Sequence, residues 1–407
     1  MTSSECRCCI VGGGPAGLVL GLLLSRRGIP TTLLEAHDDF DRAFRGDTVH
    51  PSTLEMLDDL GLAQACLEID HAKMQRMVLQ SGGEETAIAD FSRLRVKFPY
   101  IAMIPQVHLL ELLADEAAKY PAFDLRLGCR AKELLIEEGR VCGVAYERDG
   151  EREELRATLT VAADGRGSRM RKRAGFERVK NAAAMDVMWI VLPRDEGEEI
   201  EAGFRIGLGR LVVVLARQDE WQLGYVILKG DARTVRDQGL EVLRDSIRLL
   251  VPELGDRVDS IQNWKQAHHL SVESSRIPTW HRDGFLAIGD AAHVMSPIGG
   301  VGINYAIQDA VATANLLADP LLGGTLTEAD LARVQARREL PVRWIQRFQG
   351  LIQRVMVKRA LDDRPFRLPL PVRVLTALPV LRDIPARIIG WGLRPERVAG
   401  GGSVQDA

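Results

Sequence analysis

The spacing of hydrophobic and polar residues predicts a strand, a tight turn, a helix and a second strand at the start of the chain. Residues 8–11 form an apolar run that ends in a group of glycines, and leucines then recur at helical spacing from Leu18 to Leu23. A turn at 28–30 leads into a second apolar run at 31–34. A strand, helix and strand in this order are typical of a βαβ unit, so we expect the chain to begin as an α/β fold.

Alternation of apolar and polar residues predicts paired strands in the middle of the chain. It occurs in six segments, at residues 74–80, 84–90, 187–192, 203–208, 211–216 and 221–228. Short segments of this kind, separated by turns, are typical of an antiparallel sheet, and the glycines at 207–210 fit a hairpin turn. The pattern does not show which residues of this sheet face inward. Four polar or aromatic residues are therefore candidates to line a pocket on it: Trp221, Tyr225, Arg205 and His268.

Composition is that of an ordinary globular protein. The chain has 407 residues, 46% of them hydrophobic and 27% charged, which is enough for about two to three domains. The net charge of −3 gives no sign of nucleic-acid binding. We expect a cytoplasmic protein, because the N-terminus lacks a signal-peptide pattern and no uncharged apolar run reaches about 18 residues. The six cysteines lack the paired spacing of zinc ligands, so no metal site is predicted.

The glycines after the first strand form a dinucleotide-binding motif, Gly12-x-Gly14-x-x-Gly17. Gly12 permits the tight turn, Gly14 lets the backbone approach a pyrophosphate, and Gly17 lets the helix pack closely on the strand. The helix N-terminus supplies free N–H groups and a partial positive charge for the phosphates. Glu35 ends the second strand, where its carboxylate can accept hydrogen bonds from both hydroxyls of an adenosine ribose. This favours FAD or NAD over NADP.

A second glycine-rich segment, residues 284–310, follows the same order of strand, turn and helix. Asp290 comes directly after the apolar strand and can accept hydrogen bonds from a polyol. A flat ring can lie against the loop that follows, and a helix that starts near Val301 would direct its partial positive charge at that ring. A reduced flavin carries negative charge there, and Asn304 in the first turn can add a donor. The alternative is a packing unit without a ligand.

These two segments, together with the sequence VAADGRGSRMR at 161–171, resemble the para-hydroxybenzoate-hydroxylase-like, single-component FAD-dependent monooxygenases over about residues 5–320. The resemblance implies a Rossmann-like FAD-binding domain of the glutathione-reductase type. It also implies that NADH or NADPH visits as a transient reductant, whose phosphates Arg166, Arg169 and Arg171 can attract. The FAD-binding residues that it implies are Gly12, Gly14, Pro15, Ala16, Gly17, Glu35, Ala36, Arg45, Gln106, Asp164, Gly165, Gly289, Asp290, Pro297, Gly299, Gly300, Val301, Gly302 and Asn304.

Residues 44–62 carry the candidates for acid–base chemistry. Asp47 falls where the phenol-hydroxylase branch of the family has an active-site aspartate, although this chain has Arg-Gly-Asp where Arg-Ala-Asp is more usual. Asp47 or His50 could deprotonate a phenol. The alternative is that Asp47 is a turn residue and His50 a packed histidine.

The resemblance implies a hydroxylase that uses NAD(P)H and O2, through a flavin C4a-hydroperoxide, on an aromatic, phenolic or polyketide-like small molecule. Two alternatives are an FAD-dependent reductase of the geranylgeranyl-reductase type acting on a lipid, and a non-catalytic FAD-binding protein. A flavin-dependent halogenase is disfavoured, because its Gly-Trp-x-Trp-x-Ile-Pro stretch does not occur here.

The motifs divide the chain into three expected parts and a tail. We expect a discontinuous FAD-binding domain from residues 1–72, 100–175 and 276–330, with an inserted antiparallel substrate domain from residues 73–99 and 176–275. Residues 331–398 are expected to form a helical cap, followed by a disordered tail at 399–407. The basic, apolar stretch 341–397 also suits an interfacial helix pair that contacts a membrane or a partner subunit. The oligomeric state is not predicted.

Overall fold

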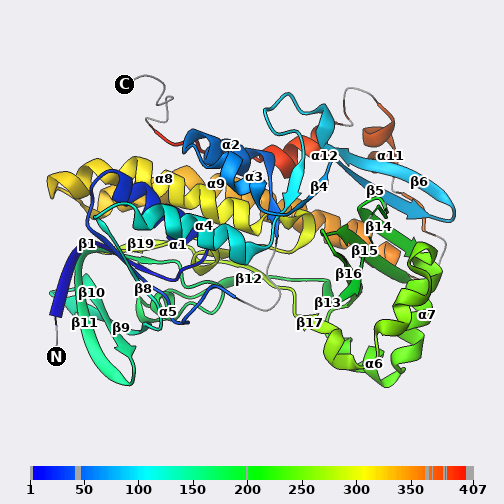
Figure 1. Cartoon of the computed structure of the whole chain (residues 1–407), viewed down its shortest axis with the longest axis horizontal. Coiled ribbons are helices and arrows are strands. Elements are labelled where there is room, and N and C mark those ends of the chain that lie inside the picture. Colours follow the sequence, from blue (N-terminus) through cyan, green and yellow to red (C-terminus); the bar gives the residue numbers. More distant parts are fainter. Residues whose placement is uncertain are drawn as a thin grey trace.

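Two large β-sheets lie side by side, and long helices extend along the molecule (Figure 1). The described residues also form two three-stranded sheets. The computed structural model describes residues 3–41, 47–195, 197–198, 200–362, 366–368, 370–378, 381 and 383–399. Arg45 and all of the expected tail except Ala399 lie outside the described residues. None of the helices within these ranges is long and apolar enough to cross a membrane.

The first sheet is built on β1 (Ser3–Val11), which pairs in parallel with β2 (Thr31–Leu34) and with β11 (Glu151–Ala162). The next parallel strands outward are β8 (Phe123–Arg126) and β20 (Phe285–Ala287). Parallel pairing brings the carboxyl ends of these strands to one edge, so residues that follow them in sequence meet there. Antiparallel strands complete the sheet: β9 (Arg130–Glu137), β10 (Arg140–Arg148) and β19 (His281–Arg282).

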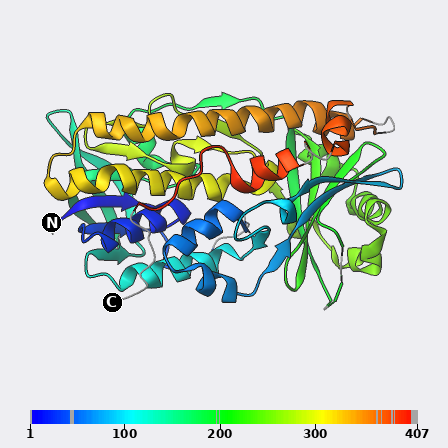
Figure 2. The ribbon, with the colours of Figure 1, turned by 90° about the horizontal axis from the view of Figure 1, so that it is seen from above.

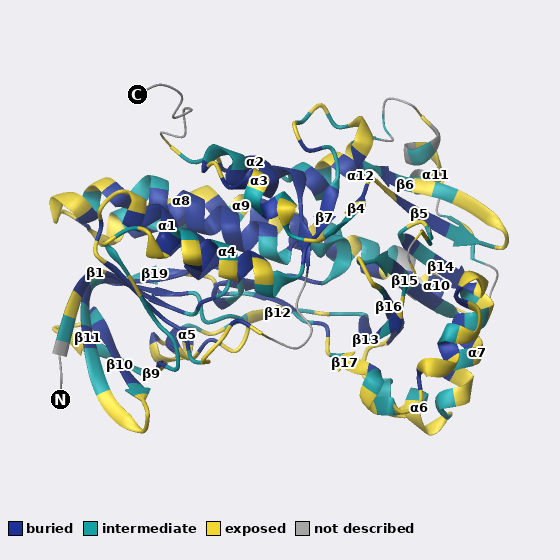
Figure 3. Cartoon of the chain, viewed as in Figure 1, coloured by how far each residue is buried: buried dark blue, intermediate teal, exposed yellow. Residues whose placement is uncertain are grey.

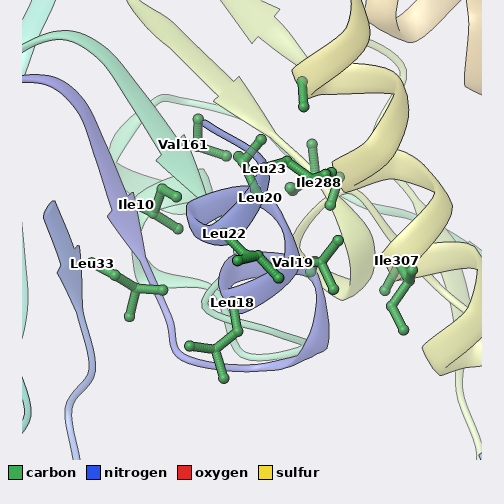
Figure 4. Packing of buried hydrophobic residues seen from close by; sticks show 14 of the residues in the cluster. Ile10, Leu18, Val19, Leu20, Leu22, Leu23, Leu33, Val161, Ile288 and Ile307 are labelled. Carbon is green, nitrogen blue, oxygen red and sulfur yellow. The ribbon is translucent and has the colours of Figure 1, made fainter. Parts of the chain in front are cut away.

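Helix α1 (Pro15–Arg26) lies at the centre of the larger core. Ten of its 12 residues are buried, which explains why it is apolar on every side rather than along one stripe. Figure 4 shows its leucines between Ile10 and Leu33 of the sheet and Ile307 of α8 (Gly302–Gly323). Full burial of each such side chain stabilises the fold by about 1.5–3 kcal/mol. The packing therefore fixes the start of α1, and with it the first glycine motif.

The second sheet contains the hairpins that alternation predicts, including the turn at 207–210. Its order is β17-β13-β16-β15-β14-β5-β6. One pair departs from the expected antiparallel arrangement, because β14 and β5 run parallel. The strands β5 and β6 come from an earlier part of the sequence than the other strands of this sheet, and β5 pairs with β14. The bounds are β5 (Arg76–Ser81), β6 (Glu84–Asp90), β13 (Met185–Pro193), β14 (Gly203–Gly207), β15 (Arg210–Ala216), β16 (Glu220–Leu228) and β17 (His268–Leu270).

The two faces of the second sheet have different neighbours. On β16, Trp221 and Tyr225 pack in a cluster with α7 (Leu240–Leu250), whereas Gln222 faces the other way. Arg205 of β14 is buried and also lies outside the cavity lining described below, and His268 is exposed. None of the four polar or aromatic candidates on this sheet therefore lines the pocket, because side chains alternate between the two faces.

Shorter elements join the two sheets and end the chain. Figure 2 shows α9 (Glu328–Ile352) running along one side of the molecule, and Figure 3 shows how the buried residues gather in the sheets and the helices that cover them. The other strands are β3 (Thr48–Val49), β4 (Ala72–Met74), β7 (Ile101–Met103), β12 (Val179–Asn181), β18 (Ser274–Arg276) and β21 (His293–Val294). They form the two three-stranded sheets, β12-β18-β21 and β3-β7-β4. The other helices are α2 (Pro51–Asp59), α3 (Ala63–Glu68), α4 (Gln106–Ala118), α5 (Arg169–Arg173), α6 (Ala232–Asp237), α9 (Glu328–Ile352), α10 (Lys358–Ala360), α11 (Leu370–Ala377) and α12 (Asp383–Ala386).

Candidate active site

A cavity of about 1300 Å³ lies where the two sheets meet the start of α8. One half is bounded by the carboxyl edge of the first sheet and by both glycine-rich segments. The other half is bounded by one face of the second sheet and by the end of α9. The sequence-predicted residues in its lining are Gly12, Gly14, Pro15, Ala16, Glu35, Ala36, Asp47, Gln106, Asp164, Gly165, Asp290, Pro297, Gly299, Gly300 and Gly302.

The three glycines of the first motif have different surroundings. Gly12 has φ +110°, and a Cβ there would lie 2.5 Å from the carbonyl oxygen of Ala163. A Cβ on Gly17 would lie 2.0 Å from the carbonyl oxygen of Gly12. A Cβ on Gly14 would meet nothing within 4 Å. The chain's own packing therefore requires glycine at two of these positions, whereas Gly14 faces open space in the cavity.

We expect Gly14→Ala to fold normally but to bind FAD at least about tenfold more weakly, a loss of roughly 1.4 kcal/mol. The added methyl group would meet only a ligand that approaches the backbone. Melting of the apoprotein and FAD titration by flavin fluorescence separate the two effects. Gly17→Ala is the matched variant and should also lower the melting temperature. If Gly14→Ala binds FAD as tightly as the wild type does, the pyrophosphate does not approach the backbone at Gly14.

Glu35 is held at the end of β2 by backbone donors. The N–H of Gly13 donates to its Oε2 at 2.7 Å, and the N–H of His37 donates to its Oε1 at 3.0 Å. The carboxylate is therefore fixed beside the glycine turn and lines the cavity. Its place matches the one expected for a residue that binds ribose hydroxyls.

Asp164 is engaged with the start of α5. Its carboxylate accepts hydrogen bonds from the Ser168 hydroxyl and from the N–H groups of Arg169 (2.7 Å) and Met170 (3.1 Å), and burial raises its pKa. Arg171 is buried and donates to the carbonyl of Ala291 at 3.3 Å. Arg171 therefore supports the packing of this region and is not a surface cation. This corrects the prediction that Arg171, like Arg166 and Arg169, can attract the phosphates of NADH or NADPH.

Asp290 is positioned through a buried cluster that the sequence analysis missed. The N–H of the preceding Gly289 donates to Oδ2 of Asp309 at 3.0 Å. Asp309 also contacts Nε2 of His293 at 2.5 Å and Nε of Arg338 at 2.9 Å, and all three side chains are at most 1% exposed. Burial alone would raise the pKa of Asp309, but His293 and Arg338 hold it below its usual value. The available sequence signal was weak: Asp309 lies near the middle of a mainly apolar helix that also contains Gln308 and Asp319.

Asn304 ties the loop before α8 to the segment after β3. Its Oδ1 accepts from the N–H of His50 (3.0 Å) and the hydroxyl of Thr53 (2.6 Å), and its Nδ2 donates to the carbonyls of Thr48 (3.2 Å) and Gly300 (3.3 Å). It is buried behind the cavity lining, so it does not offer the free donor that the sequence analysis expected. Residues Gly17, Gly289 and Val301 also lie behind the lining, and the helix begins at Gly302.

Asp47 and His50 have different environments. Asp47 lines the cavity, and its carboxylate contacts the guanidinium of Arg217 from the β15–β16 turn. Burial raises the pKa of Asp47 to about 6, against the opposing charge of Arg217. His50 is fully buried outside the cavity lining, its Nδ1 lies 2.7 Å from the carbonyl oxygen of Ile389, and burial lowers its pKa to about 4. The structure therefore favours the packed-histidine alternative for His50.

The second half of the cavity is apolar. Methionine, aliphatic and aromatic side chains dominate it, with Gln222 as a polar group on the second sheet. The described arginines of the lining, Arg130, Arg166 and Arg169, belong to the other half, and no lysine lines the cavity in the part of the chain that the structure describes. The apolar side chains contributed by the second sheet include Met185, Val187, Trp189, Phe204, Ile206, Leu211, Val213 and Val226.

The residues present fit FAD. The open Gly14 turn, the fixed Glu35 and the aspartate after β20 lie along one half of one cavity. Gly299 and Gly300 have φ of +80° and +63°, and a Cβ on Gly300 would lie 2.5 Å from the hydroxyl of Thr48. The positive φ therefore favours glycine at both positions, the packing against Thr48 also requires it at Gly300, and both residues line the cavity.

Comparison with known proteins gives three kinds of likeness. The family model described as an FAD binding domain matches residues 5–347. The 6-methylpretetramide 4-monooxygenase of Streptomyces rimosus is 33% identical over 383 residues, which cover 93% of this chain and 91% of that protein. Among solved structures, PqsL, titled a probable FAD-dependent monooxygenase from Pseudomonas aeruginosa, has a TM-score of 0.75 at 20% identity, covering 89% and 98% of the two chains. The OxyS anhydrotetracycline hydroxylase from Streptomyces rimosus has a TM-score of 0.73 at 22% identity, covering 95% and 76%. The structural likenesses show a shared fold.

Proposed function

The chain belongs to the FAD-binding-domain family, among the para-hydroxybenzoate-hydroxylase-like monooxygenases, and on that premise we propose that it hydroxylates a neutral, multi-ring phenol of the polyketide type, with NAD(P)H and O2 as co-substrates. The observation that carries the substrate proposal is the apolar half of the cavity. It is large and continuous with the FAD-binding half, and the described residues place no cation in it. A benzoate-like carboxylate would lose its hydration there without gaining a partner.

The chain's own residues would bind and orient the cofactor. The turn at Gly14 and the N-terminus of α1 would hold the pyrophosphate, Glu35 the ribose, and Asp290 the ribityl chain. Bound FAD supplies the redox chemistry, taking reducing equivalents from NAD(P)H and activating O2 for transfer of one oxygen atom. The N-terminus of α8 would stabilise negative charge on the ring, and the apolar walls would exclude water from the reaction.

Asp47 would accept the phenolic proton. With a pKa of about 6, Asp47 is mainly ionised at neutral pH. This pKa is also close to the pH at which the enzyme would work, as a general base requires. Arg217 would keep it in the charged form and hold it at the cavity wall. Its location at the junction of the two halves suits a group that contacts the substrate.

We expect kcat/KM to fall as the pH drops below about 6, because Asp47 is then protonated and cannot accept a proton. Asp47→Asn should lower kcat/KM by about 100- to 10,000-fold and remove this inflection from the pH profile. Arg217→Gln should move the inflection to higher pH, because the positive charge of Arg217 lowers the pKa of Asp47. An unchanged inflection in Asp47→Asn would assign the titration to another group.

A substrate panel tests the proposed function. NADH and NADPH oxidation by the FAD-loaded protein would be measured with neutral multi-ring phenols and, in parallel, with single-ring phenols and benzoates. The proposal expects stimulation by the multi-ring compounds together with O2 consumption. Stimulation by benzoates alone would refute the substrate class. Reduction of a lipid double bond without O2 consumption would support the reductase alternative instead.

A further inference from the structure

The C-terminal part of the chain carries an unusual local charge. Residues 340–378 contain seven arginines and one lysine against two aspartates, a net charge of +6 on a chain whose total is −3. The same residues contain many of the exposed large apolar side chains of the described structure. Exposed apolar residues within a strongly basic segment are typical of a surface that binds something both apolar and anionic.

Helix α9 carries these residues on one side. Leu340, Trp344 and Leu351 are 50%, 37% and 54% exposed, and their spacing of four and seven residues places them on one face of a helix. Arg347 is exposed beside them, and so is Arg354 in the π-helical segment Gln353–Val357 that follows α9. The ring of Trp344 stacks on Phe348, with centroids 5.6 Å apart and planes 7° from parallel. We call this set, with Arg343, the α9 face. Arg343 also pairs with Glu339 at 3.5 Å, and its side chain is 45% exposed.

The opposite side of α9 is packed into the protein. Arg338, Val342 and Ile345 are at most 1% exposed, and the amide of Gln346 donates to the carbonyls of Ser275 and Val294. Helix α9 therefore packs into the core through this opposite side. The exposed apolar residues of the α9 face are additional to the residues that hold the helix in place. In Figure 2, α9 runs along one side of the molecule with α11 near its end.

The α9 face continues into the mouth of the cavity. Leu351 is more than half exposed and also lines the cavity, together with Val355 just beyond it and Val372 of α11. On α11, Leu370 and Val374 are 71% and 45% exposed, next to the exposed Arg373. An apolar path thus runs from the surface to the half of the cavity that lacks cations.

We propose that the α9 face docks the protein on an anionic lipid surface, with Trp344 and the leucines at the level of the headgroups and the arginines paired with lipid phosphates. The charge and the exposed apolar side chains together favour this occupant. A second copy of the chain related by a twofold axis would place arginines against arginines. The docking is peripheral, since the described helices offer no membrane span. It does not depend on the proposed hydroxylation.

Vesicle sedimentation with the full-length, FAD-loaded protein tests the proposal. The probes are vesicles of phosphatidylglycerol mixed with phosphatidylcholine, and vesicles of phosphatidylcholine alone. We expect binding to the anionic vesicles only, weakened by high salt. Trp344→Ser with Leu351→Ser, and separately Arg347→Glu with Arg354→Glu, should each lower vesicle affinity at least about tenfold.

Matched controls use exposed residues that do not belong to this face. Leu208 and Leu249 are 66% and 56% exposed, and Arg233 has a 94% exposed side chain. Leu208→Ser with Leu249→Ser, and Arg233→Glu, should bind vesicles as the wild type does. Far-UV circular dichroism and FAD content would show that each variant is folded.

Four results would overturn the proposal. Three of them are no binding to anionic vesicles at low salt, equal loss of binding in the control variants, and concentration-dependent self-association that the α9-face variants abolish. A further contrary result is binding to a purified acidic carrier protein, lost in the same variants, without any vesicle binding. That outcome would make the α9 face a protein-docking surface.

Discussion

Asp290→Ala is expected to lose bound FAD and monooxygenase activity together. Asp290 follows β20 at the carboxyl edge of the first sheet and lines the cavity between the two glycine-rich segments. In the proposed assignment its carboxylate accepts hydrogen bonds from the ribityl hydroxyls, and alanine would leave those hydroxyls without this acceptor. The FAD content of the purified variant and the Kd for added FAD measure the effect, which we expect to exceed about a hundredfold in Kd, or roughly 2.7 kcal/mol.

Asp283→Ala is the matched control for this change. Asp283 lies in the turn between β19 and β20, just before the strand that leads to Asp290. It pairs with Arg140 at 2.6 Å, and both side chains are more than one third exposed. Surface pairs of this kind contribute about 0–1 kcal/mol, so this variant should keep its FAD. An Asp290→Ala protein that retains both FAD and activity would refute the assignment of Asp290.

Arg338→Met is expected to lower the free energy of unfolding of the apoprotein by about 3–5 kcal/mol, because it leaves the buried carboxylate of Asp309 without its cation. Asp309 and Arg338 are both 0% exposed. The same change should weaken FAD binding, since Asp309 accepts the N–H of Gly289 next to Asp290. Urea denaturation of the apoprotein isolates the stability effect from the stabilisation that bound FAD provides.

The neighbouring residue provides the control for this variant. Arg337 pairs with Glu396 at 2.7 Å, but its own side chain is 46% exposed. Arg337→Met should lower the unfolding free energy less than Arg338→Met does, because the carboxylate of Glu396, which is 6% exposed, keeps its contact with Arg338 at 3.5 Å. Equal losses in the two variants would show that the buried cluster is not what stabilises this region.

The local parts of the fold and site were predictable from the sequence. The first βαβ unit depends on a glycine motif and on helical spacing that lie within 30 residues of each other. The hairpin at 207–210 depends on alternation and a turn, which are also local signals. Glu35 and Asp290 could be expected at the carboxyl edge of the first sheet, because each comes within three residues of the end of a parallel strand.

The non-local parts were not predictable. The parallel pairing of β14 with β5 joins segments more than 100 residues apart, and alternation carries no information on which edge receives a strand. The contact between Asp47 and Arg217, and the cluster around Asp309, likewise join residues from separate elements. Burial of His50 depends on the distant residue Ile389, so the sequence alone left its role open.

The most direct test of the central claim is oxygen-isotope incorporation by the FAD-loaded protein. The protein would be incubated with NADH or NADPH, a neutral multi-ring phenol and 18O2, and the product analysed by mass spectrometry. We expect a product that carries one labelled oxygen atom, formed with substrate-stimulated oxidation of the nucleotide, and neither result in Asp290→Ala. A protein that binds FAD fully, yet forms no labelled product and oxidises nucleotide at the same rate with and without any phenol tested, would contradict the central claim.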